Sequence, residues 1–81
     1  MESKYLFEAR LRNRLDILNR ITTFLIQKGI PVEYLSFKRV EGDMADVEIL
    51  CVTEDIYSCK RVVNQANQLV DVAQISFRKV N

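Results

Sequence analysis

The sequence contains no histidine and no tryptophan, and it has only two cysteines, two glycines and one proline. Without histidine, the usual spacings of zinc ligands cannot form, and no histidine base is present to activate a nucleophile. A glycine-rich phosphate loop and a G-x-S-x-G turn are also absent. Enzymatic chemistry needs an activated nucleophile, a carboxylate pair in a cleft or a metal. We therefore predict no catalytic residue, no metal site and no cofactor.

Long apolar runs and an excess of one charge are missing as well. No apolar run approaches the ~20 residues that a membrane-spanning helix needs, and no signal peptide is present, so we expect a soluble, cytoplasmic protein without a membrane partner. Twelve basic and eleven acidic residues give a net charge of +1, and the two signs are interspersed. This balance gives no electrostatic reason to expect nucleic acid binding.

The length of 81 residues predicts a single domain spanning residues 1–81. A chain this short buries only about 60% of the surface that its unfolded form exposes, so we expect a partner subunit to add stability. Cys51 and Cys59 fall inside a predicted strand and a predicted helix. We interpret both as reduced thiols in or near the core.

The first 30 residues predict a strand followed by a helix. Residues 4–11 alternate between apolar side chains and polar ones such as Glu8 and Arg10, as in a half-buried strand. A helix is predicted from about Asn13 to Lys28, because apolar residues recur on one helical face: Ile17, Leu18, Ile21, Phe24 and Leu25. Asn13 and Asp16 resemble a capping pair, and Gly29 fits the position after the helix.

Residues 32–40 predict a second strand that is apolar on both faces, with Val32, Tyr34 and Val40 on one face and Leu35 and Phe37 on the other. The turn at residues 41–43 joins it to a third strand, in which Val47, Ile49 and Cys51 point inward.

A second helix follows the acidic pair Glu54 and Asp55, which suits a helix N-terminus. Its predicted buried stripe is formed by Cys59, Val62, Val63, Ala66, Leu69 and Val70. The last predicted strand spans residues 72–80, with Ala73, Ile75 and Phe77 inward.

This order predicts an α+β, ferredoxin-like βαββαβ fold: a four-stranded antiparallel sheet in the order 4-1-3-2, with two helices on one face. The strand at 32–40 then lies at an edge, where exposed apolar residues invite pairing. We therefore predict a homodimer whose interface contains Val32, Tyr34, Leu35 and Phe37.

Three other functional classes of protein share this topology, but the residues of this chain fit them poorly. RNA-recognition domains need exposed aromatics on the central strands, where this chain has Glu8 and Glu48. Metal chaperones need a Cys-x-x-Cys pair in the first loop, which has no cysteine. An acylphosphatase-like hydrolase needs a phosphate-cradling arginine, for which Arg12 or Arg14 could serve, and a partner asparagine that is not apparent. These arginines could also hold a small carboxylate at the helix N-terminus, although solvated loop arginines are the simpler interpretation.

The run at residues 64–75 resembles the end of the ACT domain in small subunits of acetolactate synthase (acetohydroxyacid synthase), where the pattern is roughly Q-L-N-K-L-[IV]-D-V-x-x-V. The matching residues are Gln65, Asn67, Leu69, Asp71 and Val72. Residues 29–35 are similar to that family's G-[FY]-N-I-x-S-L, and the likeness extends from about Tyr5 to Phe77. The chain resembles the short form of the family, which has one ACT domain.

The resemblance implies a non-catalytic regulatory subunit that activates or stabilises the large, thiamine-diphosphate-dependent subunit of acetolactate synthase in branched-chain amino-acid biosynthesis. It also implies an effector site, typically for valine, in the first loop between two ACT domains, which here is Asn13, Arg14, Leu15, Asp16 and Ile17. Where the family tends to have N-x-P-G-[VI]-L, Asp16 replaces the glycine, and its carboxylate would repel the carboxylate of an amino acid. This departure argues against a branched-chain amino acid as ligand. The alternative is a stand-alone amino-acid-sensing ACT module that regulates another enzyme or a transcription factor.

Overall fold

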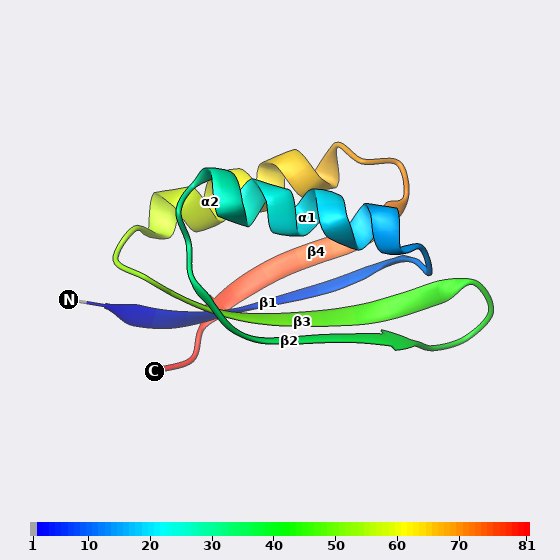
Figure 1. Cartoon of the computed structure of the whole chain (residues 1–81), viewed down its shortest axis with the longest axis horizontal. Coiled ribbons are helices and arrows are strands. Elements are labelled where there is room, and N and C mark those ends of the chain that lie inside the picture. The colour runs from blue at the N-terminus through cyan, green and yellow to red at the C-terminus, as the bar shows by residue number, and fades with distance from the viewer. Residues whose placement is uncertain (1) are drawn as a thin grey trace.

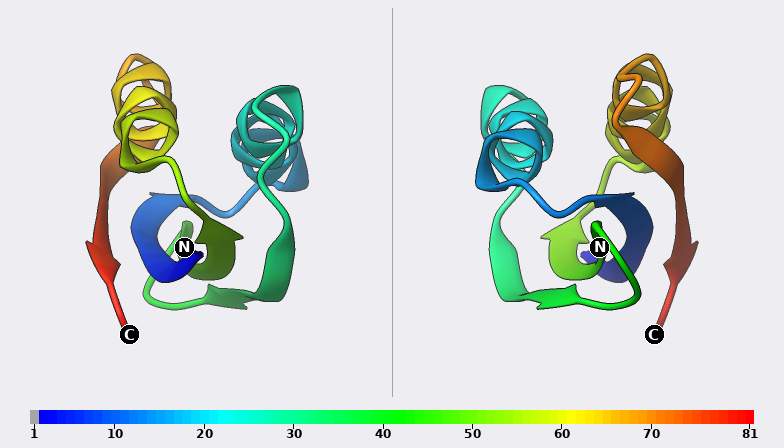
Figure 2. Two further views of the ribbon diagram at one scale, coloured as in Figure 1. Left: turned by 90° about the vertical axis from the view of Figure 1, so that its left-hand side faces the viewer. Right: turned by 90° about the vertical axis from the view of Figure 1, so that its right-hand side faces the viewer.

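The computed structural model describes residues 2–81 and contains the six elements in the predicted order. The strands are β1 (Ser3–Arg12), β2 (Val32–Arg39), β3 (Met44–Thr53) and β4 (Val72–Lys79), and the helices are α1 (Leu15–Gln27) and α2 (Ile56–Asn67). The strands form one antiparallel sheet in the order β2-β3-β1-β4. Both helices lie on one face of the sheet, and the other face is open (Figures 1 and 2). This confirms the predicted ferredoxin-like fold and strand order.

The core lies between the helices and the central strands. Side chains of β1 alternate between buried and exposed positions as the period-two pattern predicts, so that Phe7 and Leu11 are buried while Glu8 and Arg10 face solvent. The other strands and helices complete one cluster, which includes Ile17, Ile21, Leu25, Val47, Ile49, Cys51, Cys59, Val62 and Ala66.

The end of α1 matches the prediction closely. Gly29 has a φ of 65°, in the left-handed region that favours glycine. Its N–H donates to the carbonyl of Ile26 at 3.0 Å, and the N–H of Ile30 donates to the carbonyl of Leu25 at 3.0 Å. These two bonds form a Schellman motif, which satisfies the last carbonyls of the helix.

The start of α1 differs from the prediction. The N-cap residue is Arg14, and no side chain caps the helix, so the predicted Asn13 cap is wrong. The backbone N–H of Asn13 donates to the carbonyl of Asp43 at 2.8 Å, which holds Asn13 one residue before the cap position. The carboxylate of Asp16 accepts hydrogen bonds from the guanidinium group of Arg14. It does not form the predicted capping pair with Asn13.

By contrast, α2 begins where the preceding acidic pair, Glu54 and Asp55, predicts, with Asp55 as its N-cap residue. The Oδ1 atom of Asp55 accepts from the backbone N–H groups of Tyr57 at 2.9 Å and Ser58 at 3.3 Å. Its Oδ2 atom accepts from the hydroxyl of Ser58 at 2.9 Å. These bonds lower the pKa of Asp55, the hydroxyl of Ser58 contributing most.

Two irregularities in the sheet change which residues share a face. The register of β2 against β3 shifts between Val32 and Tyr34, so that Val32 pairs with Cys51 on the helix-covered face and Tyr34 pairs with Leu50 on the open face. The prediction that Val32 and Tyr34 share a face is therefore wrong, because a bulge at Glu33 breaks the alternation.

A second shift occurs where Arg10 pairs with Gln74 and Leu11 pairs with Val72. Ala73 is the extra residue of this bulge and is exposed, contrary to its predicted inward position.

Val70 was predicted in the buried stripe of α2, but its side chain is 96% exposed. The helix ends at Asn67, so the helical period no longer applies to Val70.

Candidate functional site

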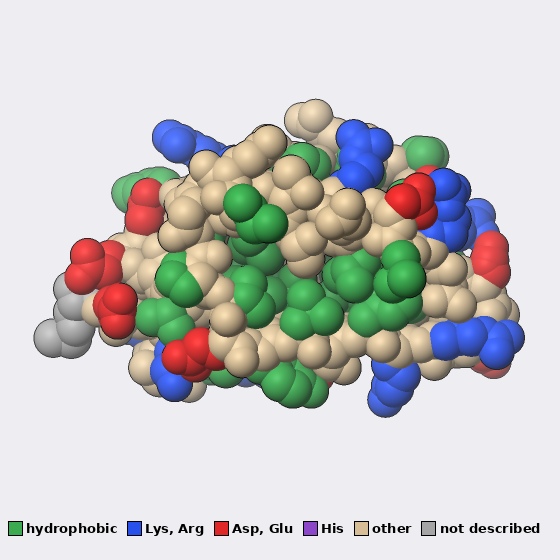
Figure 3. All heavy atoms as spheres, in the orientation of Figure 1, with side chains coloured by type: hydrophobic (Ala, Val, Ile, Leu, Met, Phe, Trp, Pro, Cys, Tyr) green, Lys and Arg blue, Asp and Glu red, His purple; other side chains and the backbone are tan. Residues whose placement is uncertain are grey.

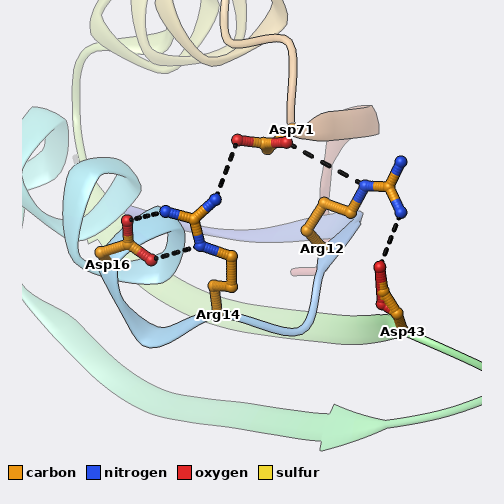
Figure 4. A network of polar contacts seen from close by, with 5 residues as sticks. All are labelled: Arg12, Arg14, Asp16, Asp43 and Asp71. Carbon is orange, nitrogen blue, oxygen red and sulfur yellow. Dashed lines mark hydrogen bonds and ion pairs between the residues drawn. The ribbon is translucent and has the colours of Figure 1, made fainter.

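A network of two arginines and three aspartates surrounds the loop between β1 and α1, where the effector residues are predicted (Figure 4). Arg14 pairs with Asp16 through two hydrogen bonds, of 2.7 and 3.1 Å, and its Nη1 atom lies 3.7 Å from Asp71. Arg12 pairs with Asp43 at 2.7 Å, and its Nε atom lies 4.0 Å from Asp71. Asp71 therefore stands between the two guanidinium groups.

This network joins three segments that are far apart in the sequence. Arg12 is the last residue of β1 and Arg14 lies in the loop that follows, whereas Asp43 belongs to the turn between β2 and β3 and Asp71 to the segment between α2 and β4. A backbone hydrogen bond also joins two of these segments, since the N–H of Arg12 donates to the carbonyl of Asp71 at 2.9 Å. Exposed ion pairs contribute little energy individually, so the backbone bonds and the bidentate Arg14 pair do most to order the loop.

The charges of the network leave no cation free to receive an anionic ligand. The hydrogen bond and charge of Asp16 raise the pKa of Arg14. Two guanidinium groups face three carboxylates, which gives the cluster an excess of negative charge. The arrangement therefore argues against the small-carboxylate site that the sequence suggested for Arg12 and Arg14.

The five predicted effector residues do not form one pocket. Ile17 is only 5% exposed and belongs to the core, whereas Leu15 is 70% exposed. Asn13, Arg14 and Asp16 are exposed, with the two charged side chains bound to each other. Next to them, a shallow hollow of about 420 Å³ lies on the outer side of α1, lined by Leu15, Asp16, Leu18, Asn19 and Thr22.

The predicted dimer interface lies on an edge strand, as expected, and is partly exposed. Val32, Tyr34 and Leu35 are 42%, 52% and 40% exposed, and Phe37 is partly buried against the core. On α1, two further large apolar side chains reach solvent, Leu15 and Ile26.

Figure 3 shows hydrophobic side chains gathered along the seam between α1 and β2. We call this region the α1–β2 surface and define it by its exposed or partly buried residues: Leu15, Leu18, Ile26, Val32, Leu35 and Phe37. The exposure of Leu15 and Ile26, in the helical part of this surface, was not predicted. Its signal was present in the spacing of Leu15, Leu18 and Ile26, which places them together beside the buried stripe of α1.

The two cysteines are buried and free, as predicted. Burial raises the pKa of Cys51 to about 12 and that of Cys59 to about 11. Thiols in this state are weak nucleophiles and weak metal ligands.

Among residues 2–81 there is no group of three or more acidic or sulfur side chains arranged to hold a metal ion, and neither helix there is long and apolar enough to cross a membrane.

No protein-family model matches the sequence, and no curated protein matches it. Solved structures do match. The C-terminal domain of the MgtC protein from Mycobacterium tuberculosis has a TM-score of 0.82 at 10% identity, over 96% of this chain and 87% of that one. The ACT domain from GTP pyrophosphokinase of Chlorobium tepidum has a TM-score of 0.79 at 5% identity, over 96% and 100%. An ACT domain protein from Streptococcus pneumoniae has a TM-score of 0.77 at 10% identity, over 95% and 89%.

The chain therefore has the ferredoxin-like fold of ACT domains. Identities this low show the fold alone, and one fold supports many functions. None of these three structures is described as a subunit of acetolactate synthase. The partner that the sequence likeness implies is accordingly a matter for proposal.

Proposed function

We propose that the chain is a non-catalytic regulatory module of the ACT type, which dimerises through the α1–β2 surface and controls an enzyme by binding to it. The main support for this proposal is the exposure of apolar side chains on the α1–β2 surface. Leu15, Ile26, Val32 and Leu35 are each at least 40% exposed in the single chain. Exposed apolar residues beside an open sheet edge favour association with another chain.

A second copy fits this edge well. Two β2 strands paired edge to edge would continue the sheet and cover Val32 and Leu35 on its helix side. The same contact would bring the two α1 helices together and cover Leu15 and Ile26. Small domains gain much of their stability from such partners, because their own cores are limited.

For the regulated enzyme, we propose the large catalytic subunit of acetolactate synthase, and a site of action in the cytoplasm. The support for this partner is the sequence likeness at residues 64–75. Two buried free thiols are compatible with a reducing compartment. The module would favour the active conformation of the large subunit by binding that conformation more tightly.

Within this proposal, holding the partner is better supported than sensing valine. The first loop carries an excess of carboxylates, and Arg14 is already occupied by Asp16 and Asp71. An amino-acid carboxylate placed there would meet negative charge. A second candidate function, amino-acid sensing, is favoured by the hollow beside Leu15 and Thr22, which a second copy on the α1–β2 surface would help to enclose.

A pull-down and a calorimetric titration test the two candidates. The tagged chain should recover the large subunit of acetolactate synthase from the source cells, identified by mass spectrometry, and should bind none of the twenty amino acids. Clear binding of an amino acid by the isolated dimer would instead establish the sensor. Recovery of no acetolactate synthase, with no effect on its activity, would refute the proposed partner.

A further inference from the structure

The face of the sheet opposite the helices contains a hollow of about 420 Å³ at its centre. Antiparallel pairing aligns the side chains of this open face in rows that cross the four strands. The row at the floor of the hollow is Ser36, Glu48, Glu8 and Ser76, in that order from β2 to β4. Two carboxylates therefore lie directly opposite each other on β1 and β3, between two hydroxyls.

Like charges in directly opposed positions destabilise a sheet. Glu8 is compensated, since it accepts a hydrogen bond from Arg78 at 3.2 Å. Glu48 has no hydrogen bond or ion pair with any residue in the described range 2–81. The centre of the hollow thus holds a carboxylate that faces another carboxylate and has no cation of its own.

Of the two cations in the neighbouring row of the hollow, Arg10 is engaged with Asp46. Arg10 donates two hydrogen bonds to Asp46, of 2.8 and 3.1 Å. These bonds, followed by the charges of Arg10 and Lys38, lower the pKa of Asp46. Asp46 accepts both hydrogen bonds of Arg10 and is stabilised by the charge of Lys38. Glu48 is therefore the carboxylate of this face that remains open to an external cation.

The row on the other side of the hollow is apolar across three strands. It consists of Tyr34, Leu50 and Leu6, which the register aligns next to the carboxylate row. Tyr34 is 52% exposed, and the two leucines are half-buried. A carboxylate without a partner and an apolar strip thus lie one row apart on the same concave face.

We propose that this open face docks a segment of the regulated enzyme in which a lysine or arginine lies next to an apolar residue. The cation would bind Glu48 and relieve its repulsion with Glu8, and the apolar side chain would rest on Tyr34, Leu50 and Leu6. This inference rests on the proposed function, because it presupposes a partner enzyme, and it assigns to that partner a surface distinct from the α1–β2 surface.

The charges of the face disfavour two other occupants. A second copy related by a two-fold axis through the hollow would bring the carboxylate row of one chain against that of the other. Nucleic acid phosphates would meet Glu8 and Glu48 at the centre. A basic and apolar protein segment satisfies both rows at once.

Titration of isotope-labelled chain with short peptides, followed by amide NMR shifts, tests this inference without the enzyme. The probes are acetyl-Leu-Lys-Leu-amide and acetyl-Leu-Glu-Leu-amide. The lysine peptide should shift amides around Glu8, Glu48 and Leu50, and the glutamate peptide should not. Glu48→Gln should weaken binding of the lysine peptide about fivefold, the effect of one exposed ion pair. Glu54→Gln, the same change in the loop before α2, should leave binding unchanged.

Equal binding of both peptides, shifts confined to the α1–β2 surface, or unchanged binding by Glu48→Gln would overturn the docking face. The proposed function can fail separately. If the lysine peptide binds the open face but no acetolactate synthase is recovered, the enzyme partner is wrong and the docking face stands. If the enzyme binds and Glu48→Gln leaves its affinity unchanged, the docking face is wrong and the regulatory function stands.

Discussion

Substitution of Leu35 by aspartate should separate the proposed dimer into monomers. Full burial of a leucine side chain stabilises by about 1.5–3 kcal/mol. The 40% of Leu35 that is exposed in the single chain leaves roughly 1 kcal/mol to be gained on association. Two-fold symmetry presents this side chain twice, so its contribution is roughly 2 kcal/mol, or about 30-fold in the dissociation constant.

An aspartate at this position has a larger effect than the lost apolar contact. Each carboxylate would be taken out of water without a cationic partner, which costs several kcal/mol. The combined loss predicts a dissociation constant at least about a thousandfold higher. The monomer should tolerate the change, because residue 35 is already partly exposed to solvent.

Sedimentation velocity over a dilution series from micromolar to millimolar measures the effect. The native chain should sediment as a dimer and Leu35→Asp as a monomer, with unchanged far-ultraviolet circular dichroism. Val70→Asp is the matched control, since Val70 is 96% exposed in the segment after α2. A native chain that stays monomeric at millimolar concentration, or a Leu35→Asp variant that dimerises as well as the native chain, would show that the α1–β2 surface is not a dimer interface.

Three further predictions concern the single chain. Gly29→Ala should destabilise it by about 1–2 kcal/mol in urea unfolding, because φ is 65° and an added Cβ meets no atom within 4 Å, so that backbone strain is the whole cost; no change would contradict the left-handed cap. Cys51 and Cys59, with pKa values raised to about 12 and 11, should resist iodoacetamide at mildly alkaline pH until the chain unfolds, and rapid labelling of the native protein would show that they are accessible. Because the pKa of Asp55 is lowered by folding, its stabilisation should be complete above the ordinary value of 3.8 and lost as the pH falls through the lower folded value; Asp55→Asn should flatten the acid side of the stability curve, and an unchanged curve would contradict this.

The fold was predictable because local patterns agree with one another. The alternation around Glu8 and Arg10 and the left-handed cap at Gly29 are encoded within a few residues, and both were confirmed. The errors at Val32 and Ala73 have one cause. A bulge inserts a residue and reverses the alternation, and neither position carries a glycine or proline that would signal it.

The first loop was less predictable because its partners come from distant segments. The spacing of Asn13 and Asp16 predicted a capping pair. Asp16 instead pairs with Arg14, whose second partner, Asp71, lies 57 positions further along the sequence. Only the assembled sheet brings them together. The unpartnered Glu48 was also hidden, since its position opposite Glu8 depends on the register of β1 and β3.

We propose that this chain regulates a partner enzyme by binding to it and performs no catalysis itself. The most direct measurement is the activity of the purified acetolactate synthase large subunit from the same source, titrated with the native chain at saturating substrate and thiamine diphosphate. We predict that activity rises to a plateau at a fixed ratio of the two chains, and that Glu48→Gln requires a higher concentration to reach it. Activity that is the same at every ratio, with no complex on gel filtration, would contradict the claim.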